Sequence, residues 1–138
     1  MLDREIEKGI LPYCHAHSIS ALAYSPLEQG LLTGKIGMSQ TFPEGAFRNN
    51  IPWFRPVNRK KVLNMLEAWS DLLPKYNCSL SQLVIAWTMA QEGITFVLCG
   101  ARKEAHVKDN VGAGDLELEA ADLSRIRQDV ESLGAPEE

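Results

Sequence analysis

The chain has 138 residues with a formal net charge of −4 at pH 7, and 45% of its residues are hydrophobic and 23% charged. This composition is ordinary for a globular protein and gives no electrostatic reason to expect nucleic acid or an anionic membrane as a partner. No apolar run approaches the roughly 18 residues that span a bilayer. Cys14, Cys78 and Cys99 lack metal-ligand spacing, so we expect buried free thiols, no metal site and a cytoplasmic location.

The first half of the chain predicts a helix, a buried strand and a long loop. A helix is expected over residues 3–14, and residues 19–23 are apolar without polar alternation, which is typical of a strand buried on both faces of a parallel sheet. Pro26 ends strand pairing, so residues from Tyr24 onward lie at the carboxyl exit of this strand. Residues 28–58 are interrupted by glycines and prolines, and a loop of that length is usually functional.

The second half predicts four helices and one further buried strand. The helices are expected over about residues 58–73, 79–91, 102–111 and 119–133, and the strand over residues 95–99. Ser79 and Gln82 form the pattern of a capping box. Strands that alternate with helices favour an α/β fold with parallel strands. Two parallel strands cannot bury both faces or satisfy their outer edges, so residues 1–138 are expected to be one incomplete unit of a larger architecture.

Both predicted strand exits have features of an anion-binding site. The segment Cys99-Gly-Ala-Arg102 leads directly into a helix N-terminus, where free N–H groups and the helix dipole favour an anion and Arg102 adds a positive charge. Such a turn is also common as a purely structural feature. At the other exit, Tyr24 and Ser25 lie where the open end of a parallel barrel holds ligands. The Tyr24 ring there could be core, rim or a stacking surface, and spacing alone does not choose.

Three longer stretches are more specific. Residues 23–35, Ala-Tyr-Ser-Pro-Leu-Glu-Gln-Gly-Leu-Leu-Thr-Gly-Lys, resemble the seventh strand and following loop of aldo-keto reductases. Residues 42–48 resemble the continuation of that loop, and residues 98–113 resemble the eighth strand with its NADP-binding helix. The resemblance is closest to the branch with bacterial aldo-keto reductases and potassium-channel beta subunits. It implies an α/β fold that is the C-terminal part of a TIM (β/α)8 barrel, covering about strands seven and eight.

The resemblance implies an NADP(H) site at the first strand exit. Tyr24 occupies the place of the aromatic residue that stacks on the nicotinamide ring. Ser25, Leu27 and Gly30 match the segment that wraps the pyrophosphate and ribose, where glycine lets the backbone approach the phosphates.

The basic residues of the long loop and of the second strand exit complete the implied site. Lys35 and Arg48 match loop positions that close over the cofactor like a clasp. Gly100 and Arg102 match the second exit, and Arg102 stands where the family contacts the 2′-phosphate of adenosine, which favours NADP over NAD.

The adenine end is implied by the last matching helix. Asp109 and Asn110 match the positions that contact the adenine. The sequence departs from the family pattern at His106, which replaces a common glutamine, and at Asp109, which is one methylene shorter than the usual glutamate.

The catalytic residues of the family are not matched in this chain. The family mechanism uses a tyrosine as general acid, a lysine, an aspartate and a histidine, all contributed by the first half of the barrel. Tyr13 and Tyr76 lie in settings that do not match the acid. The resemblance therefore implies the cofactor-binding part of an NADP-dependent reductase of small carbonyl substrates, and we expect this chain alone to be inactive.

Two further hypotheses stay open at this point. The chain could be a non-catalytic NADP-binding or interaction module whose strand edges are covered by a second copy. It could also complement a separately made N-terminal barrel half. Met1 resembles an internal position of the family rather than its N-terminus, so a truncated chain is expected.

Overall fold

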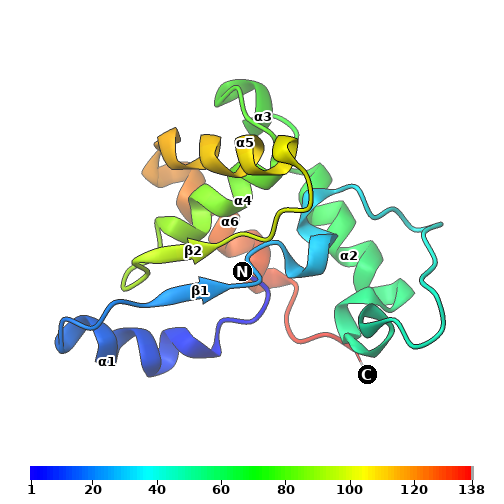
Figure 1. The fold of residues 1–138 in the computed structure, drawn as a ribbon, viewed down its shortest axis with the longest axis horizontal. Helices are drawn as coiled ribbons and strands as arrows, with labels where there is room; N and C mark the ends of the chain where they lie inside the picture. The colour runs from blue at the N-terminus through cyan, green and yellow to red at the C-terminus, as the bar shows by residue number, and fades with distance from the viewer. Residues whose placement is uncertain (138) are drawn as a thin grey trace.

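The computed structural model describes residues 1–137, which form an α/β structure dominated by helices (Figure 1). The strands of this part are β1 (Leu22–Tyr24) and β2 (Phe96–Leu98), and its α-helices are α1 (Ile10–Ala16), α2 (Pro56–Glu67), α3 (Leu72–Lys75), α4 (Leu80–Met89), α5 (Glu104–Gly112) and α6 (Ala120–Ser132). Its 3₁₀ helices are η1 (Glu5–Lys8), η2 (Glu28–Thr33), η3 (Phe47–Asn50), η4 (Pro52–Phe54) and η5 (Ala113–Asp115).

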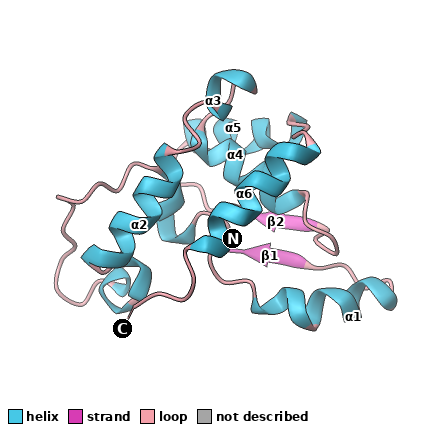
Figure 2. Ribbon diagram, turned by 180° about the vertical axis from the view of Figure 1, so that it is seen from behind, coloured by secondary structure: helices cyan, strands magenta, loops and turns pink. Residues whose placement is uncertain are grey.

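Strands β1 and β2 form a parallel pair, which confirms the pairing predicted from the alternation of strands and helices. Ala23 lies opposite Val97 in the register of this pair. Figures 1 and 2 show α4 and α6 on one side of the pair, while its other side has no covering layer. Because the strands are parallel, both end at the same edge. The segments that lead into η2 and α5 therefore start side by side.

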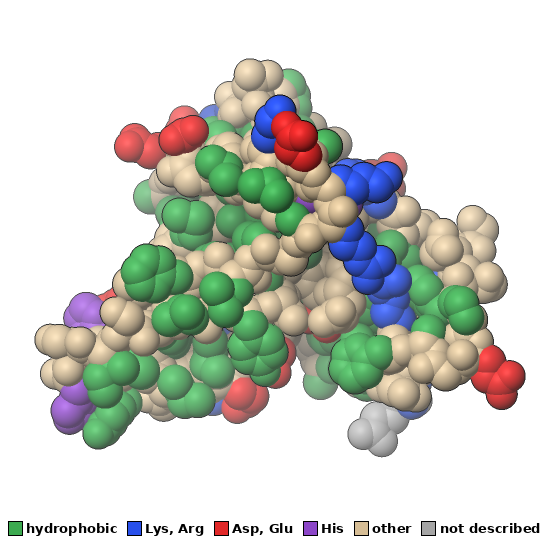
Figure 3. All heavy atoms as spheres, in the orientation of Figure 1, with side chains coloured by type: hydrophobic (Ala, Val, Ile, Leu, Met, Phe, Trp, Pro, Cys, Tyr) green, Lys and Arg blue, Asp and Glu red, His purple; other side chains and the backbone are tan. Residues whose placement is uncertain are grey.

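The predictions that residues 19–23 are buried on both faces and that residues 95–99 form a second buried strand are both wrong for this chain. The side chains that point away from α4 and α6 are exposed by 52% for Leu22, 81% for Tyr24, 57% for Phe96 and 52% for Leu98. Figure 3 shows this apolar face continuing toward α1. Burial on both faces needs a second layer, which the described residues do not supply. Strand β1 also begins three residues later than predicted, at Leu22, and extends one residue past its predicted end.

The first predicted helix, residues 3–14, is divided into η1 and α1. Asp3 Oδ1 accepts a hydrogen bond from a backbone N–H two residues later (3.2 Å), but the chain leaves helical geometry at Gly9, with φ −148° and ψ −54°. Pro12 has no N–H to donate to the carbonyl four residues earlier. Continuous α-helical bonding therefore cannot cross Gly9, and α1 begins with Pro12 in its first turn.

The helix predicted over residues 58–73 ends early, at Glu67. The backbone N–H groups of Trp69 and Ser70 donate to carbonyls three residues earlier, at 3.2 Å and 3.0 Å, so the chain tightens into 3₁₀ geometry. Pro74 cannot donate to the carbonyl of Ser70. A separate helix of a single turn, α3, follows, and Pro74 is its third residue.

The core lies between α2, α4 and α6, and two tryptophans fill its centre. Trp69 and Trp87 are almost completely buried. Trp69 Nε1 donates to Asp129 Oδ2 (2.8 Å), and Trp87 Nε1 donates to the Leu123 carbonyl (3.1 Å). Buried indole N–H groups need such partners, so these bonds fix α6 against α4 and against the segment that follows α2. Ile126 of α6 is buried, as its spacing predicts.

Residues 28–58, predicted as a long loop, fold into short helices that are tied to the body of the protein. The buried Arg59 side chain donates from Nε (3.1 Å) and Nη2 (2.7 Å) to the Phe54 carbonyl, and from Nη1 (2.7 Å) to the Gln40 carbonyl. A guanidinium has no acceptor capacity and a fixed donor fork, so it holds both parts of the loop in one geometry. Helix α2 accordingly starts at Pro56, slightly before its predicted start.

The Asp122 carboxylate joins α3 to the start of α6. Asp122 Oδ2 accepts hydrogen bonds from Lys75 Nζ (2.7 Å) and Tyr76 Oη (2.5 Å), and Tyr76 Oη accepts one from the Glu119 N–H (2.9 Å). The bond from Lys75, followed by that from Tyr76, lowers the pKa of Asp122. Burial, followed by the bond to Asp122, raises the pKa of Tyr76. This phenol is thus a structural group, consistent with its mismatch to the catalytic acid.

We expect Asp122→Asn to lower the free energy of unfolding at neutral pH by about 1–3 kcal/mol, because it weakens hydrogen bonds to a charged group. The folded-state pKa of Asp122 lies below its ordinary value, so its contribution is present above the ordinary pKa and disappears as pH falls through the folded-state pKa. Denaturant unfolding from about pH 7 to about pH 2 measures this. The gap between parent and variant should close on acidification. A constant gap, or an equal effect of Asp115→Asn on the exposed surface, would contradict it.

Candidate functional site

A groove of about 600 Å³ lies at the edge where both strands end. The predicted residues that line it are Ser25, Leu27, Gly30, Lys35, Arg48, Gly100, Arg102, His106, Asp109 and Asn110. Figure 3 shows Lys and Arg side chains gathered in a band between α5 and the part of the molecule that holds α2. Parallel pairing thus brings two segments that are distant in sequence into one concave, basic site.

The chain leaves β1 through a turn with unusual backbone geometry, which shapes one wall of the groove. Ser25, Glu28 and Gln29 have positive φ angles of 52°, 45° and 52°, and Gly30 has a φ of 95°. Non-glycine residues rarely adopt this region, and such strain concentrates at functional sites. A Cβ atom at Gly30 would lie 3.7 Å from Arg48 Nη2. That contact would be an ordinary one, so it is the positive φ angle, rather than a lack of space, that favours glycine at position 30.

Arg48 anchors the long loop to that turn. Its Nε and Nη2 atoms donate to the Gln29 carbonyl at 2.9 Å and 2.7 Å. Its guanidinium carbon lies 5.2 Å from the centre of the Phe42 ring and 6.0 Å from that of Phe54. Arg48 lines the groove at the predicted place. Its bonds also give it a second role, which the sequence did not predict: it fixes the strained turn.

The turn between β2 and α5 forms the second wall. Gly100 to Arg102 follow the strand and α5 begins at Glu104, which confirms that this turn leads directly into a helix N-terminus. The first N–H groups of a helix have no intrahelical acceptor and carry partial positive charge. The Arg102 N–H donates to His106 Nδ1 (3.4 Å), and Asn110 Nδ2 donates to the Gly100 carbonyl (3.5 Å). These two bonds hold the turn against α5.

Two basic side chains of the groove have no partner within residues 1–137. Neither the Lys35 ammonium nor the Arg102 guanidinium makes a hydrogen bond or ion pair there, although the backbone N–H groups of both residues do. The carboxylate of the groove, Asp109, instead accepts a hydrogen bond from Ser79 Oγ (2.9 Å). The cationic side chains of Lys35, Arg48 and Arg102 outnumber the one carboxylate of the groove, Asp109, and none of them forms an ion pair with it. The donors of the groove suit phosphate groups, so the residues present fit a dinucleotide.

Tyr24 is the predicted residue that does not line the groove. It precedes Ser25 and lies on the exposed strand face, where it is largely exposed. Cys99 does line the groove, and burial raises the pKa of its thiol. A thiol with a raised pKa stays protonated at neutral pH and is a poor nucleophile. All three cysteines are free and half-buried, rather than buried as predicted. The side chains of the groove thus indicate binding rather than covalent chemistry.

Several groove residues were missed from the sequence. Gln29, Thr33, Ile36 and Ser81 all line it. Gln29 precedes the predicted Gly30, so the turn itself was a usable signal. Ser81 comes from the first turn of α4, and no local pattern shows that this turn approaches the strand ends. Its position depends on tertiary packing.

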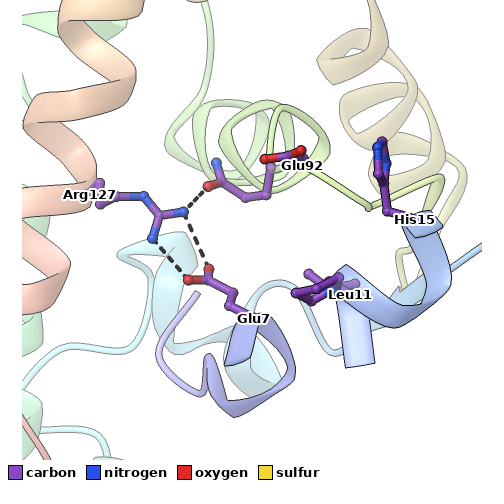
Figure 4. Close-up of a pocket in the computed structure, with 7 residues that line it drawn as sticks. Glu7, Leu11, His15, Glu92 and Arg127 are labelled. Atoms are coloured by element: carbon purple, nitrogen blue, oxygen red, sulfur yellow. Dashed lines mark hydrogen bonds and ion pairs between the residues drawn. The ribbon is translucent and has the colours of Figure 1, made fainter. Parts of the chain in front are cut away.

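A second hollow, of about 350 Å³, lies between η1, α1 and α6 (Figure 4). Its central guanidinium, Arg127, is already held by the protein. Arg127 donates to Glu7 Oε2 (2.9 Å), to Glu7 Oε1 (3.4 Å) and to Gln91 Oε1, and it lies 5.5 Å from the centre of the Trp87 ring. These contacts join the two ends of the chain and leave little positive charge for an anionic ligand. This hollow is therefore a structural junction.

The described residues 1–137 hold no group of His, Cys, Asp and Glu side chains arranged to bind a metal ion. In the same part of the chain, no helix combines the length and the apolar character needed to cross a membrane.

Comparison with known proteins assigns the chain to a family. The sequence profile described as "Aldo/keto reductase family" matches residues 1–131. The chain belongs to the aldo/keto reductase family. This match confirms the family resemblance that the sequence motifs at the two strand exits indicate. In the structure, residues of both motifs line the same groove.

Relatives within the aldo/keto reductases include the NADH-specific methylglyoxal reductase of Escherichia coli (strain K12), 39% identical over 133 residues, which are 96% of this chain and 40% of that protein. An aldo-keto reductase of Schizosaccharomyces pombe, whose name includes NADP(+), is 30% identical over 137 residues, with 95% of this chain and 40% of that protein covered. The solved glycerol dehydrogenase of Gluconobacter oxydans has a TM-score of 0.82 at 33% identity, over 99% of this chain and 41% of that one.

This aldo/keto reductase chain thus spans about two fifths of the length of the relatives it matches. The family uses nicotinamide cofactors, but the names of the first two relatives differ in the cofactor they state. Family membership therefore leaves open whether this groove takes the form with or without the 2′-phosphate.

We expect Arg48→Met to loosen the turn after β1, because it leaves the Gln29 carbonyl without its two guanidinium donors. The backbone N–H of Gly30, which donates to the Leu27 carbonyl (2.9 Å), should exchange with solvent about tenfold faster. Amide hydrogen exchange followed by NMR measures this. Arg55→Met is the matched control, since Arg55 is exposed and outside the groove. Equal exchange rates in both variants would show that Arg48 does not hold the turn.

Proposed function

We propose that the groove at the strand ends binds NADP(H), and that this chain is the cofactor-holding part of an aldo/keto reductase. One observation carries the proposal: the unpaired Lys35 and Arg102 side chains line the same groove as the N-terminal turn of α5. Phosphate groups bind at helix N-termini and beside unpaired cations. The strand ends are also where open α/β architectures hold their ligands.

The proposed roles follow the position of each residue along the groove. The turn from Ser25 to Gly30 and the Lys35 ammonium hold the phosphates, and Arg102 holds the 2′-phosphate. The nicotinamide stacks on the accessible ring of Tyr24, just beyond the groove. Asn110 lies beside Gly100 at the adenine end. Bound there, the cofactor supplies a hydride; the residues of this chain bind and orient it.

We expect the chain to bind NADPH more tightly than NADH, and Arg102→Ala to weaken NADPH binding about tenfold or more while changing NADH binding little. The reason is that Arg102 is the unpaired guanidinium available for the extra phosphate. Lys35→Ala should weaken both cofactors, because the pyrophosphate is common to them. Fluorescence titration with each cofactor measures the dissociation constants.

The controls are Arg55→Ala and Lys60→Ala, which remove exposed basic side chains outside the groove. Equal affinity for the two cofactors and no effect of Arg102→Ala would refute the NADP preference. The name of the E. coli relative states specificity for NADH, so the opposite preference has a precedent in a related protein. Failure to bind either cofactor would refute the groove as a self-sufficient cofactor site.

We further propose that β1 and β2 are strands seven and eight of a (β/α)8 barrel, and that residues 1–138 form one incomplete barrel segment. The exposed apolar face over Leu22, Tyr24, Phe96 and Leu98 supports this, since a barrel would bury it. Its cover would be an N-terminal barrel half. A cytoplasmic location stays a prediction from the free cysteines.

The whole protein is proposed to reduce a small carbonyl substrate, with the catalytic acid, lysine, aspartate and histidine supplied by other residues than those of this chain. We expect the chain alone to oxidise no NADPH above background with a panel of aldehydes. Co-expression with an N-terminal barrel half should restore turnover, because both parts of the site are then present. The measurement is the loss of NADPH absorbance.

A second candidate function is a non-catalytic NADP-binding or interaction module, which the same exposed face favours if a second copy covers it. Turnover by the chain alone would contradict both the expected inactivity of this chain and the non-catalytic module. A stable oligomer in sedimentation that binds NADPH, with no turnover in a well-folded complex with the N-terminal half, would favour the module over the reductase.

A further inference from the structure

The capping box of α4 is the starting point. Ser79 Oγ accepts a hydrogen bond from the Gln82 N–H (3.2 Å), and Gln82 Oε1 accepts one from the Ser79 N–H (2.8 Å). The sequence predicts this arrangement, and it satisfies two of the free N–H groups at the helix start. A capping box normally acts within its own helix.

This capping box also contacts α5. The Ser79 hydroxyl donates a hydrogen bond to Asp109 Oδ1 (2.9 Å). One turn further along α5, a Cβ atom at Gly112 would clash with Gln82 Nε2, so the α5 backbone lies directly on the Gln82 side chain. Positions 109 and 112 are three apart and share one helix face. Both members of the capping box therefore meet the same face of α5.

Polar contacts matter more for α5 than for the other long helices. None of its residues is buried, and the side chains of Val107 and Val111 are exposed by 50% and 68%. Hydrophobic burial, which usually fixes a helix on its core, therefore contributes little to where α5 lies. Burial, followed by the Asp109 charge, raises the pKa of the adjacent Cys78 thiol, and Asp109 itself is half-buried between α5 and the start of α4.

We propose that Ser79 is a positioning residue for the cofactor site: through Asp109 it holds α5, and with it His106 and Asn110, in place along the groove. The inference rests on the proposed NADP(H) function. It also gives Asp109 a different role from the adenine contact that the family resemblance implies, because its Oδ1 is engaged with Ser79. Ser79 itself does not line the groove, so its effect on the ligand is indirect. The route through α5 and Asp109 has to be separated by experiment from a route through the first turn of α4, which carries Ser81.

The test measures the binding of NADPH and of adenosine 2′,5′-bisphosphate, which probes the adenosine end alone. Ser79→Ala and Asp109→Ala should each weaken both ligands about tenfold, which is the size expected for one lost hydrogen bond to a charged group. Ser79→Thr keeps the hydroxyl and should restore affinity to within about twofold. Ser124→Ala is the matched control, since the Ser124 hydroxyl bonds only within α6.

A double-mutant cycle separates positioning from direct contact. If Ser79 acts through Asp109, the double alanine variant should bind about as weakly as either single variant. If Asp109 contacts the ligand and Ser79 only caps α4, the two effects should multiply to about a hundredfold, and that result would overturn the proposal. Unchanged affinity of the Ser79→Ala variant for both ligands would also overturn the proposal.

A ligand-free readout distinguishes failure of this inference from failure of the proposed function. Amide hydrogen exchange should accelerate in α5 of the Asp109→Ala variant, which leaves the cap of α4 intact, and stay unchanged in α6. Absence of NADPH binding by the unsubstituted chain would refute the proposed function and the cofactor role of Ser79 with it. Unchanged exchange in α5 would refute the tether itself, whatever the chain binds.

Discussion

The parallel pairing of β1 with β2 is the constraint on which the rest of the site depends. Only three residues of each strand take part in the pairing. Paired residues are more than seventy positions apart in the sequence, yet both strands end at the same edge of the sheet. The strained turn at Ser25 and the turn into α5 then face each other across the groove. An antiparallel pair would place one of these turns at the opposite end. The turn into α5 supplies Arg102 and the helix N-terminus, and the chain after β1 supplies Lys35 and Arg48, so the parallel pairing is what brings all of them to one groove.

The arginines of the chain divide into those that hold structure and those that are free to bind. Arg59 and Arg127 direct their donors at protein carbonyl and carboxylate groups, and Arg48 gives two of its donors to the turn beside the groove. Arg102 has no such partner in residues 1–137. A guanidinium is charged at all physiological pH values, so an unpaired one in a concave site favours an anionic ligand. This contrast separates the groove from the second hollow around Arg127.

Much of this arrangement could be predicted because its signals are local. The capping box, the parallel strands and the helix after Gly100 follow from spacing and turn residues, and the family motifs identify ten of the residues that line the groove. Other features depend on contacts between distant segments. The engagement of Asp109 by Ser79 and the approach of Ser81 to the strand ends leave no periodic trace. Residues 19–23 read as fully buried because an apolar strand looks the same whether or not a second layer is present.

The most direct test is to map where NADP⁺ binds, by following the backbone amide NMR signals of the chain during a titration. The account predicts that the largest shifts fall at Gly30, Gly100 and Arg102, on both walls of the groove. Signals of Glu7 and Gln91, at the second hollow, should stay in place. Shifts centred on that hollow, or no shifts at saturating cofactor, would contradict the assignment of the groove as the cofactor site.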